Sequence, residues 1–199
     1  MKFIILIFWI LIGYISGSFP TGYLLGKMRG INLTKIGSGG TGATNVLRNL
    51  GKGPAIITLL VDVLKGFLPV YLSLKFTGCH FTAMFVAFAS VIGHSKSVFL
   101  KFKGGKSSAT GLGVLLALSY EVALITFSIW LIVVLTSRYS SLGSIVAIPF
   151  VPILLYLFHK PTVYIIFGVC VAVYIVLIRH KDNIKRLLNG TEPKIGEKK

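Results

Sequence analysis

The sequence predicts an all-α polytopic membrane protein with about seven transmembrane helices. Hydrophobic residues make up 54% of its 199 residues and charged residues only 13%, which is about half the charged share of a soluble domain. Long apolar runs alternate with short polar segments, and a helix needs about 20 residues to cross the hydrocarbon core. The same composition excludes an intrinsically disordered chain, a collagen and a coiled coil.

Seven apolar runs are the candidate spans, and they cover about residues 3–25, 54–74, 81–95, 108–120, 122–136, 145–158 and 162–178. The first, second and seventh runs are long enough to span a bilayer alone. The fourth and fifth are short and are separated only by residues 119–121, so they form either a helical hairpin or one long helix. Residues 1–18 also resemble a signal peptide, but the apolar stretch continues to Leu25 and further runs follow, which favours a span.

The basic residues predict the orientation, because cytoplasmic loops of membrane proteins are enriched in Lys and Arg. With the N-terminus outside, 17 basic residues lie on the cytoplasmic side and only Lys2, Lys75 and Lys160 lie outside. The C-terminus is then cytoplasmic, and residues 119–121 form an outer hairpin turn. We expect residues 1–199 to be a single integral membrane domain whose functional groups lie at the cytoplasmic face. The cytoplasmic segments are the loops at about 27–53, 96–107 and 137–144 and the tail 179–199.

The net charge of +16 indicates anionic ligands. On a soluble protein it would indicate a nucleic-acid surface. Here the basic residues lie between apolar runs, so we interpret them as topology signals and as sites for anionic ligands or lipid headgroups, with no nucleic-acid partner. The two cysteines, Cys79 and Cys170, are too few for a disulfide framework. No Cys/His cluster has the spacing of a metal site, so we expect neither a metal nor a cofactor.

The first cytoplasmic loop contains the sequence Gly-Ser-Gly-Gly-Thr-Gly at residues 37–42. With Asp62 twenty residues on, it imitates a dinucleotide-binding fingerprint. That motif needs a buried strand in a βαβ unit, whereas Asp62 lies inside an apolar run. One alternative is a flexible loop that joins two helices. We favour a nest of backbone N–H groups that binds an anion at the start of a helix beginning near Thr44, with Arg48 one turn further on.

The second cytoplasmic loop contains Gly-Gly-Lys-Ser-Ser at residues 104–108, directly before an apolar run. It resembles the end of a Walker A loop, but the first glycine of that pattern would fall at Leu100. A helix N-terminus, hydroxyl groups and a lysine together favour an anionic ligand. A loop that only sets the topology would explain Lys101 and Lys103 but not the two glycines before Lys-Ser-Ser.

Two of the apolar runs contain ionisable residues, which are costly in a membrane and often functional. Asp62 and Lys65 lie three residues apart on one helical face, so we expect them to pair, either as a structural salt bridge or as part of the catalysis. His94 ends the third run and is either a capping residue or an acid/base group. At the C-terminus, residues 179–190 predict an amphipathic helix that ends at Gly190, or a generic basic segment at the membrane surface.

Together these segments resemble the bacterial PlsY-type glycerol-3-phosphate acyltransferases, which use acyl phosphate as the donor. The resemblance covers essentially the whole chain. The matching residues are Gly17-Ser18 with Pro20-Thr21, Gly37-Ser38-Gly39, Gly42 to Asn45 with Arg48, Asp62 with Leu64-Lys65-Gly66, Gly93-His94, Phe102 to Lys106 with Ala109-Thr110, Arg138 to Leu142 with Ser144, and Arg179-His180 with Asn183-Ile184 and Arg186-Leu187.

The resemblance implies the first acylation step of phospholipid synthesis. A fatty acyl group passes from acyl phosphate to the 1-hydroxyl of sn-glycerol 3-phosphate, which yields 1-acylglycerol 3-phosphate (lysophosphatidic acid) and phosphate. It also implies a multi-pass protein of the bacterial cytoplasmic (inner) membrane, in contact with membrane lipids and with its active site on the cytoplasmic side. The alternative is a membrane transporter of an organic phosphate, but we find no convincing internal repeat of the kind that transporters show.

Acyl-CoA is not expected as a donor. Acyltransferases that use acyl-CoA or acyl-carrier protein have a histidine followed, after four residues, by an aspartate. This chain has no such pair, because the residues at the aspartate position after its four histidines are Phe85, Phe99, Tyr164 and Lys185.

The resemblance also implies roles for individual residues. The catalytic candidates are Arg48, His94, Lys106 and Ser144, and the substrate- and phosphate-binding candidates are Ser38, Gly39, Thr44, Asn45, Gly104, Gly105, His180 and Asn183. The first loop would hold a phosphate, Lys106 and Ser144 would neutralise developing charge, and the tail residues would orient the acceptor. The hydroxyl proton would go to the leaving phosphate or to His94.

Four positions depart from the family pattern. The family often has Asn at position 40, Gly at 107 and Tyr-Pro at 96–97, where this chain has Gly40, Ser107 and Lys96-Ser97. A serine at 107 costs little if its φ is negative. We expect the loss of the proline to loosen the second loop.

Overall fold

The computed structural model describes residues 2–197. Lys198 and Lys199, the end of the predicted cytoplasmic tail, lie outside the described residues. Every regular element between residues 2 and 197 is a helix, and the one β-type pairing there is an isolated bridge between Ser97 and Lys103. The predicted all-α class is confirmed.

The helices follow the predicted apolar runs closely. In chain order they are α1 (Lys2–Ser18), α2 (Thr21–Lys27), α3 (Ala43–Leu50), α4 (Lys52–Thr77), α5 (His80–Ser95), the short 3-10 helix η1 (Val98–Leu100), α6 (Ser108–Leu118), α7 (Tyr120–Ser137), α8 (Ser140–Ala147), α9 (Phe150–Leu157), α10 (Thr162–Val173), the π-helix η2 (Tyr174–Arg179) and α11 (Lys181–Leu188).

Length and hydropathy identify the spans among these helices. Within residues 2–197, four helical segments are long and apolar enough to cross a membrane: 2–27, 52–77, 120–137 and 162–179. The pair α8 and α9, bent by 42°, adds a fifth when counted as one broken span. The shorter helices α5 and α6 are also apolar. All seven predicted runs therefore coincide with apolar helices, four or five of which meet the full criteria for a span.

The break between α6 and α7 decides between the two predictions for residues 108–136. Ser119 separates the helices in an extended conformation (φ −163°, ψ 102°) and caps α7, since its Oγ accepts a hydrogen bond from the Val122 backbone N–H. Its Oγ also donates to Glu121 Oε2 at 2.7 Å. One continuous helix is therefore excluded.

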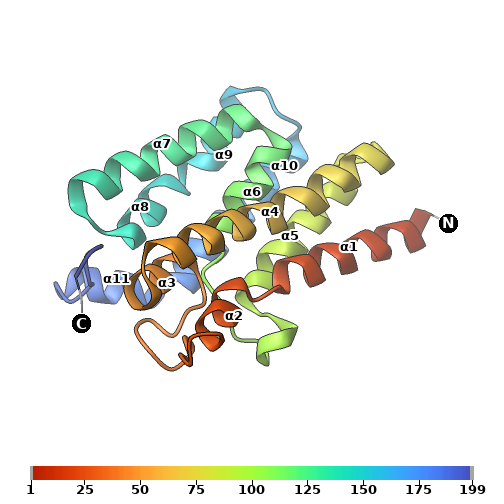
Figure 1. The fold of residues 1–199 in the computed structure, drawn as a ribbon. Coiled ribbons are helices and arrows are strands. Elements are labelled where there is room, and N and C mark those ends of the chain that lie inside the picture. The colour runs from red at the N-terminus through yellow and green to blue at the C-terminus, as the bar shows by residue number, and fades with distance from the viewer. Residues whose placement is uncertain (1, 198–199) are drawn as a thin grey trace. The chain divides into compact units, whose positions relative to one another are not determined.

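The chain forms two compact units, one up to Leu118 and the other from Ser119 onward. In the first unit, α1 packs on α5, and α4 packs on α1, α5 and α6 (Figure 1). Glycines bring these backbones very close together. An added methyl group at Gly17 would overlap the Ser90 carbonyl oxygen, and one at Gly113 would overlap that of Val63. Small residues allow this approach, which is typical of helix packing in membranes.

In the second unit, α7 packs on α8 and α9, and α9 packs on α10 (Figure 1). Trp130 Nε1 on α7 donates to the Ser140 carbonyl oxygen at the start of α8, at 3.3 Å. Lys160, just before α10, forms an ion pair with Glu121 at the start of α7, at 3.3 Å. These contacts fix the ends of the helices that carry the loop at 137–144 and the tail.

Candidate active site

Asn45 organises the first loop from the first turn of α3. Its side chain is buried, and its Oδ1 accepts a hydrogen bond from the Ser38 backbone N–H at 3.2 Å. Its Nδ2 donates to three carbonyl oxygens of the loop at 3.2, 3.3 and 2.7 Å, those of Leu33, Ile36 and Gly40. The Asn45 side chain thus holds the shape of the loop, on which Ser38 is exposed.

Glycines allow the chain to turn on either side of Ser38. Gly37 and Gly39 have φ values of +59° and +66°, in the left-handed region that glycine adopts without strain. A methyl group on Gly37 would also overlap Asn45 Oδ1. The N–H groups of Ser38 and Gly39 donate within the loop, to Asn45 Oδ1 and to the Ile36 carbonyl oxygen, so the anion nest stays a prediction.

Thr44 and Arg48 lie one turn apart on α3, and both are partly buried. The helix begins at Ala43, close to the predicted start. Its N-cap, Gly42, has no side chain that could accept a hydrogen bond from the first turn. A helix start without a side-chain cap leaves its N-terminal N–H groups suited to an anion.

Ser97 fastens the second loop. Its backbone N–H donates to the Lys103 carbonyl oxygen at 3.2 Å, and its Oγ donates to the Ser18 carbonyl oxygen at 2.6 Å. A proline at this position could form neither bond. The expected loosening of the loop is therefore not what the structure shows, because the serine adds two attachments.

Ser107 lies in a backbone conformation that glycine would favour. Its φ is +68°, so the condition for a low cost, a negative φ, is not met. In compensation, its buried Oγ donates to the Val91 carbonyl oxygen on α5 at 2.7 Å. Lys106 precedes it, is partly buried and lies two residues before the start of α6.

Asp62, Lys65 and His94 form a buried cluster. Lys65 Nζ lies 2.8 Å from Asp62 Oδ1, which confirms the predicted pair, and His94 Nδ1 lies 3.6 Å from the same oxygen. All three residues are at most 6% exposed. Gly104 and Gly105 lie directly against His94, and the Gly105 N–H donates to the His94 carbonyl oxygen at 3.1 Å.

In the second unit, His180 and Asn183 are buried at the end of the last apolar helix. The chain passes through the π-helix η2 before His180, and the His180 Nδ1 donates to the Ile175 carbonyl oxygen at 2.8 Å. Single π-helical turns are frequent at functional sites. Asn183 follows on α11, and Ser144, also buried, lies on α8.

Glu192 connects these elements, and sequence reasoning missed it. Its Oε1 accepts hydrogen bonds from Ser141 Oγ on α8 and from Asn183 Nδ2 on α11, both at 2.7 Å. Its Oε2 accepts from Arg186 Nε at 2.7 Å. Burial alone would raise the pKa of Glu192, but the hydrogen bonds from Ser141, Arg186 and Asn183, with the charge of Arg186, hold that pKa below its usual value.

The contacts of Glu192 have a direct consequence for Asn183. The amide nitrogen of Asn183 is turned toward Glu192, whereas its buried Oδ1 has no hydrogen-bond partner within residues 2–197. A buried acceptor without a partner is unfavourable, so this oxygen is a natural contact for a hydroxyl group of a ligand.

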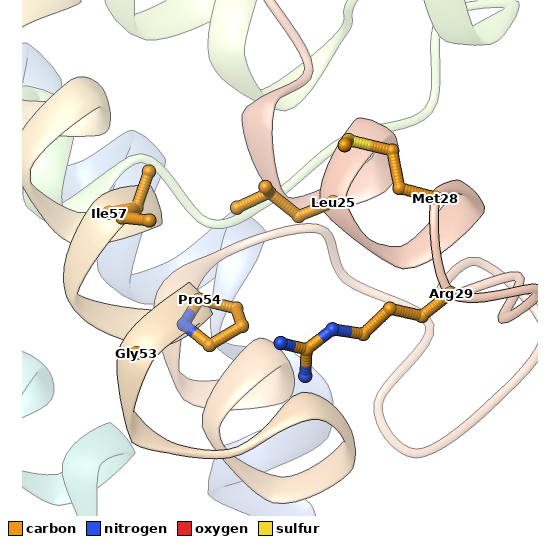
Figure 2. A pocket seen from close by; sticks show the side chains of 6 residues that line it. All are labelled: Leu25, Met28, Arg29, Gly53, Pro54 and Ile57. Atoms are coloured by element: carbon orange, nitrogen blue, oxygen red, sulfur yellow. The ribbon is translucent and has the colours of Figure 1, made fainter.

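A groove of about 420 Å³ lies elsewhere on the first unit, and none of the predicted site residues lines it. Figure 2 shows Leu25 and Met28 facing Pro54 and Ile57, with the Arg29 side chain reaching between them. Arg29 Nη1 donates to the Leu50 carbonyl oxygen at 2.7 Å, so the guanidinium ties the end of α2 to the end of α3.

The structure gathers the predicted residues into three sets. The first unit holds one set on the first loop and α3 (Ser38, Gly39, Thr44, Asn45 and Arg48) and a second set around His94 (His94, Gly104, Gly105 and Lys106). The second unit holds Ser144, His180 and Asn183. Glu192 joins α8, which carries Ser144, to α11, which carries Asn183. Within residues 2–197, no three His, Cys, Asp or Glu side chains are grouped as metal ligands.

Comparison with known proteins identifies relatives along nearly the whole chain. The family model described as glycerol-3-phosphate acyltransferase matches residues 7–190. A glycerol-3-phosphate acyltransferase of Carboxydothermus hydrogenoformans is 50% identical over 190 residues, covering 95% of this chain and 96% of the relative. One from Crocosphaera subtropica is 46% identical over 210 residues, covering 100% and 97%.

Two solved structures are also similar. They are crystal structures of PlsY (YgiH), described as an integral membrane glycerol 3-phosphate acyltransferase. The glycerol 3-phosphate form has a TM-score of 0.92 and 38% identity, covering 96% of each chain. The lysophosphatidic acid form has a TM-score of 0.89 and 38% identity, covering 96% of this chain and 95% of the other. With these matches and its apolar helices, the chain is a multi-pass membrane protein and belongs to the glycerol-3-phosphate acyltransferase family.

Proposed function

We propose that this protein transfers a fatty acyl group from acyl phosphate to the 1-hydroxyl of sn-glycerol 3-phosphate, and that residues 1–199 act as one domain. The observation that carries the proposal is the similarity, over 96% of the chain, to PlsY structures solved in glycerol 3-phosphate and lysophosphatidic acid forms. These ligands are the acceptor and the product of such a transfer. Membership in an acyltransferase family favours this function over the transporter considered above.

Both phosphate-bearing substrates require cationic and N–H-rich sites, and two loops of the first unit have these properties. In the first loop, Ser38, Gly39, Thr44, Asn45 and Arg48 bind one phosphate, and the Asn45 side chain also keeps the loop in shape. The support is the glycine geometry beside Ser38 and the start of α3 without a side-chain cap.

In the second loop, Gly104, Gly105 and Lys106 bind phosphate charge. In the second unit, Ser144 contributes a hydroxyl donor. Lys106 lies two residues before the start of α6, so its charge adds to the positive end of the helix dipole. Such fixed positive groups stabilise the charge that develops on the phosphate as the acyl bond breaks.

His180 and Asn183 orient the acceptor. Asn183 Oδ1 accepts the hydrogen bond of a glycerol hydroxyl, because Glu192 holds the amide nitrogen and leaves the oxygen for the ligand. His180 is held by its bond to the Ile175 carbonyl, which keeps the proton on Nδ1 and directs Nε2 away from that carbonyl.

The transfer needs no covalent enzyme intermediate, since acyl phosphate is already activated. The 1-hydroxyl oxygen attacks the carbonyl carbon, the bond between that carbon and the phosphate oxygen breaks, and phosphate leaves. The leaving phosphate takes the hydroxyl proton; His94 is the alternative acceptor within the protein.

We further propose seven spans in the bacterial cytoplasmic membrane, with the N-terminus outside and the C-terminus, the loops and the active site on the cytoplasmic side. The support for seven is that, beside the four long apolar segments, the short helices α5 and α6 and the bent pair α8–α9 are also apolar. The support for the orientation is the distribution of basic residues, 17 inside against three outside.

The native Cys79 tests this topology, because it is exposed in the connector predicted to lie outside. A membrane-impermeant maleimide should label wild-type protein on intact cells and should not label Cys79→Ser. In the Cys79→Ser background, Lys35→Cys in the first loop should react only after permeabilisation. Labelling of Lys35→Cys on intact cells would contradict the proposed orientation.

The function is tested with purified protein in detergent, palmitoyl phosphate and glycerol 3-phosphate, by measuring release of phosphate and formation of lysophosphatidic acid. Both products should appear in equal amounts, and palmitoyl-CoA should not replace the donor. Comparable rates with palmitoyl-CoA would contradict the proposed donor. No product with either donor would contradict the proposed function itself.

A further inference from the structure

The buried cluster of Asp62, Lys65 and His94 borders the second loop without forming part of it. Asp62 and Lys65 are 1% and 6% exposed, and Asp62 Oδ1 is the oxygen nearest to both Lys65 Nζ and His94 Nδ1. Charges in the apolar part of a membrane protein are costly to retain, which suggests a role beyond helix packing.

The cluster reaches the second loop through His94. The Gly105 N–H donates to the His94 carbonyl oxygen at 3.1 Å. A methyl group on Gly105 would overlap Nε2 of the His94 ring, and one on Gly104 would overlap the His94 carbonyl oxygen. The two glycines therefore pack on different parts of the same residue, one on its ring and the other on its backbone.

Lys65 fixes the opposite side of the cluster. Its Nζ donates to the Phe19 carbonyl oxygen, between α1 and α2, at 2.9 Å. Its own carbonyl oxygen accepts from Ser16 Oγ at 3.1 Å. Asp62 and Lys65 are thus tied to α1, so that the His94 ring lies against a firmly held carboxylate.

We propose that the Asp62–Lys65–His94 cluster positions the turn at Gly104, Gly105 and Lys106, and that His94 acts through this turn and does not accept the hydroxyl proton. Both ring nitrogens of His94 face protein groups, Nδ1 toward Asp62 and Nε2 toward Gly105. The inference rests on the proposed function, because it assigns the turn to a substrate phosphate. Displacement of such a turn by about 1 Å costs up to about 100-fold in rate.

Size complementation between His94 and Gly105 tests the proposal. Gly105→Ala should lose about 100-fold in kcat/KM, because the new methyl group pushes the turn away from the ring. Adding His94→Ala removes the ring, and the double variant should recover at least about tenfold relative to Gly105→Ala. A double variant that is no more active than Gly105→Ala would overturn the proposal.

Gly104→Ala is the matched control. Its methyl group would overlap the His94 backbone, which His94→Ala leaves in place. The combination of Gly104→Ala with His94→Ala should therefore recover nothing. Equal recovery for both glycine variants would overturn the proposal, since it would show a general loosening of the loop.

Asp62→Asn gives a second test that does not depend on how much protein folds. Loss of folded enzyme lowers the apparent kcat and leaves both KM values unchanged. Displacement of the turn instead raises the KM for one of the two phosphate-bearing substrates by about tenfold, and raises the KM for the other substrate less. Unchanged KM values for both substrates would overturn the proposal.

The assays use full-length protein in detergent with palmitoyl phosphate and glycerol 3-phosphate. Wild-type protein without activity under these conditions would contradict the proposed function. Active wild-type protein without the specific recovery would contradict only the role of the cluster.

Discussion

Glu192 anchors the C-terminal segment by its charge, and replacing it with the isosteric amide tests this. In Glu192→Gln, the amide oxygen can still accept from Ser141 and Asn183, but only as a neutral acceptor. Hydrogen bonds to a charged group contribute about 1.5–3 kcal/mol and neutral ones about 0.5–1.5 kcal/mol. The bond from Arg186, whose side chain is 34% exposed, adds no more than about 1 kcal/mol. We therefore expect a loss of about 2–4 kcal/mol in the stability of the docked segment.

The measurement is hydrogen exchange of the backbone amides around Glu192 in detergent, together with thermal unfolding. The matched control is Glu197→Gln, an exposed glutamate whose Oε2 accepts from the Lys194 backbone N–H. It should change exchange around Glu192 by less than about 0.5 kcal/mol. Equal exchange in the two variants would refute the reasoning.

The pH dependence of the same measurement has a definite sign. Because the pKa of Glu192 is lowered in the folded protein, its contribution is fully present above the pKa of the unfolded chain, about 4.3. It is lost as the pH falls through the lower folded value. The difference between wild type and Glu192→Gln should therefore shrink below about pH 4.3. A difference that stays constant down to pH 3 would mean that the charge is not its source.

Three further pairs of substitutions test the loops and the scaffold. Lys106→Ala should lower kcat by about 10²–10³-fold, as expected for a group that stabilises transition-state charge, whereas the exposed Lys101→Ala should change it little; equal losses would favour a merely basic loop. Ser107→Gly should be more stable than Ser107→Ala by about 1 kcal/mol in the free energy of unfolding, and should therefore unfold at a higher temperature. Both variants lose the hydrogen bond to the Val91 carbonyl oxygen, but only alanine keeps the strain of the left-handed backbone. The reverse order would contradict the assigned φ. Gly113→Ala should cost about 1–3 kcal/mol by overlap with the Val63 backbone, and Gly53→Ala, which meets nothing within 4 Å, should be close to neutral in the same thermal assay.

The sequence predicted the helices well because a membrane span leaves a signal in one stretch of chain. Each apolar run became helical, although the runs at 3–25 and 145–158 are each divided into two helices. The polar break at Ser119 became the end of one helix and the cap of the next. The pairing of Asp62 with Lys65 was predictable for the same reason, since three residues separate them on one helix.

The features that could not be predicted depend on contacts between distant segments or on backbone angles. Glu192 follows Gly190 in a short polar tail, and its partner Ser141 lies 51 residues earlier; nothing in the local pattern connects them. Asn45 was expected to bind phosphate, and this role remains a prediction. Its hydrogen bonds to the loop depend on carbonyl groups whose direction the sequence does not specify. The positive φ of Ser107 is likewise a property of the fold, since a serine more often has a negative φ.

The close backbone contacts of the first unit have a thermodynamic consequence. Burial of apolar surface from water gives soluble proteins their large heat-capacity change on unfolding. Where α1 meets α5 and α4 meets α6, glycines bring carbonyl groups against helix backbone, and in a membrane these surfaces are surrounded by lipid whether or not the helices are in contact. The association of these helices therefore carries little heat-capacity change, and its free energy should vary almost linearly with temperature, without the weakening on cooling that a water-driven core shows.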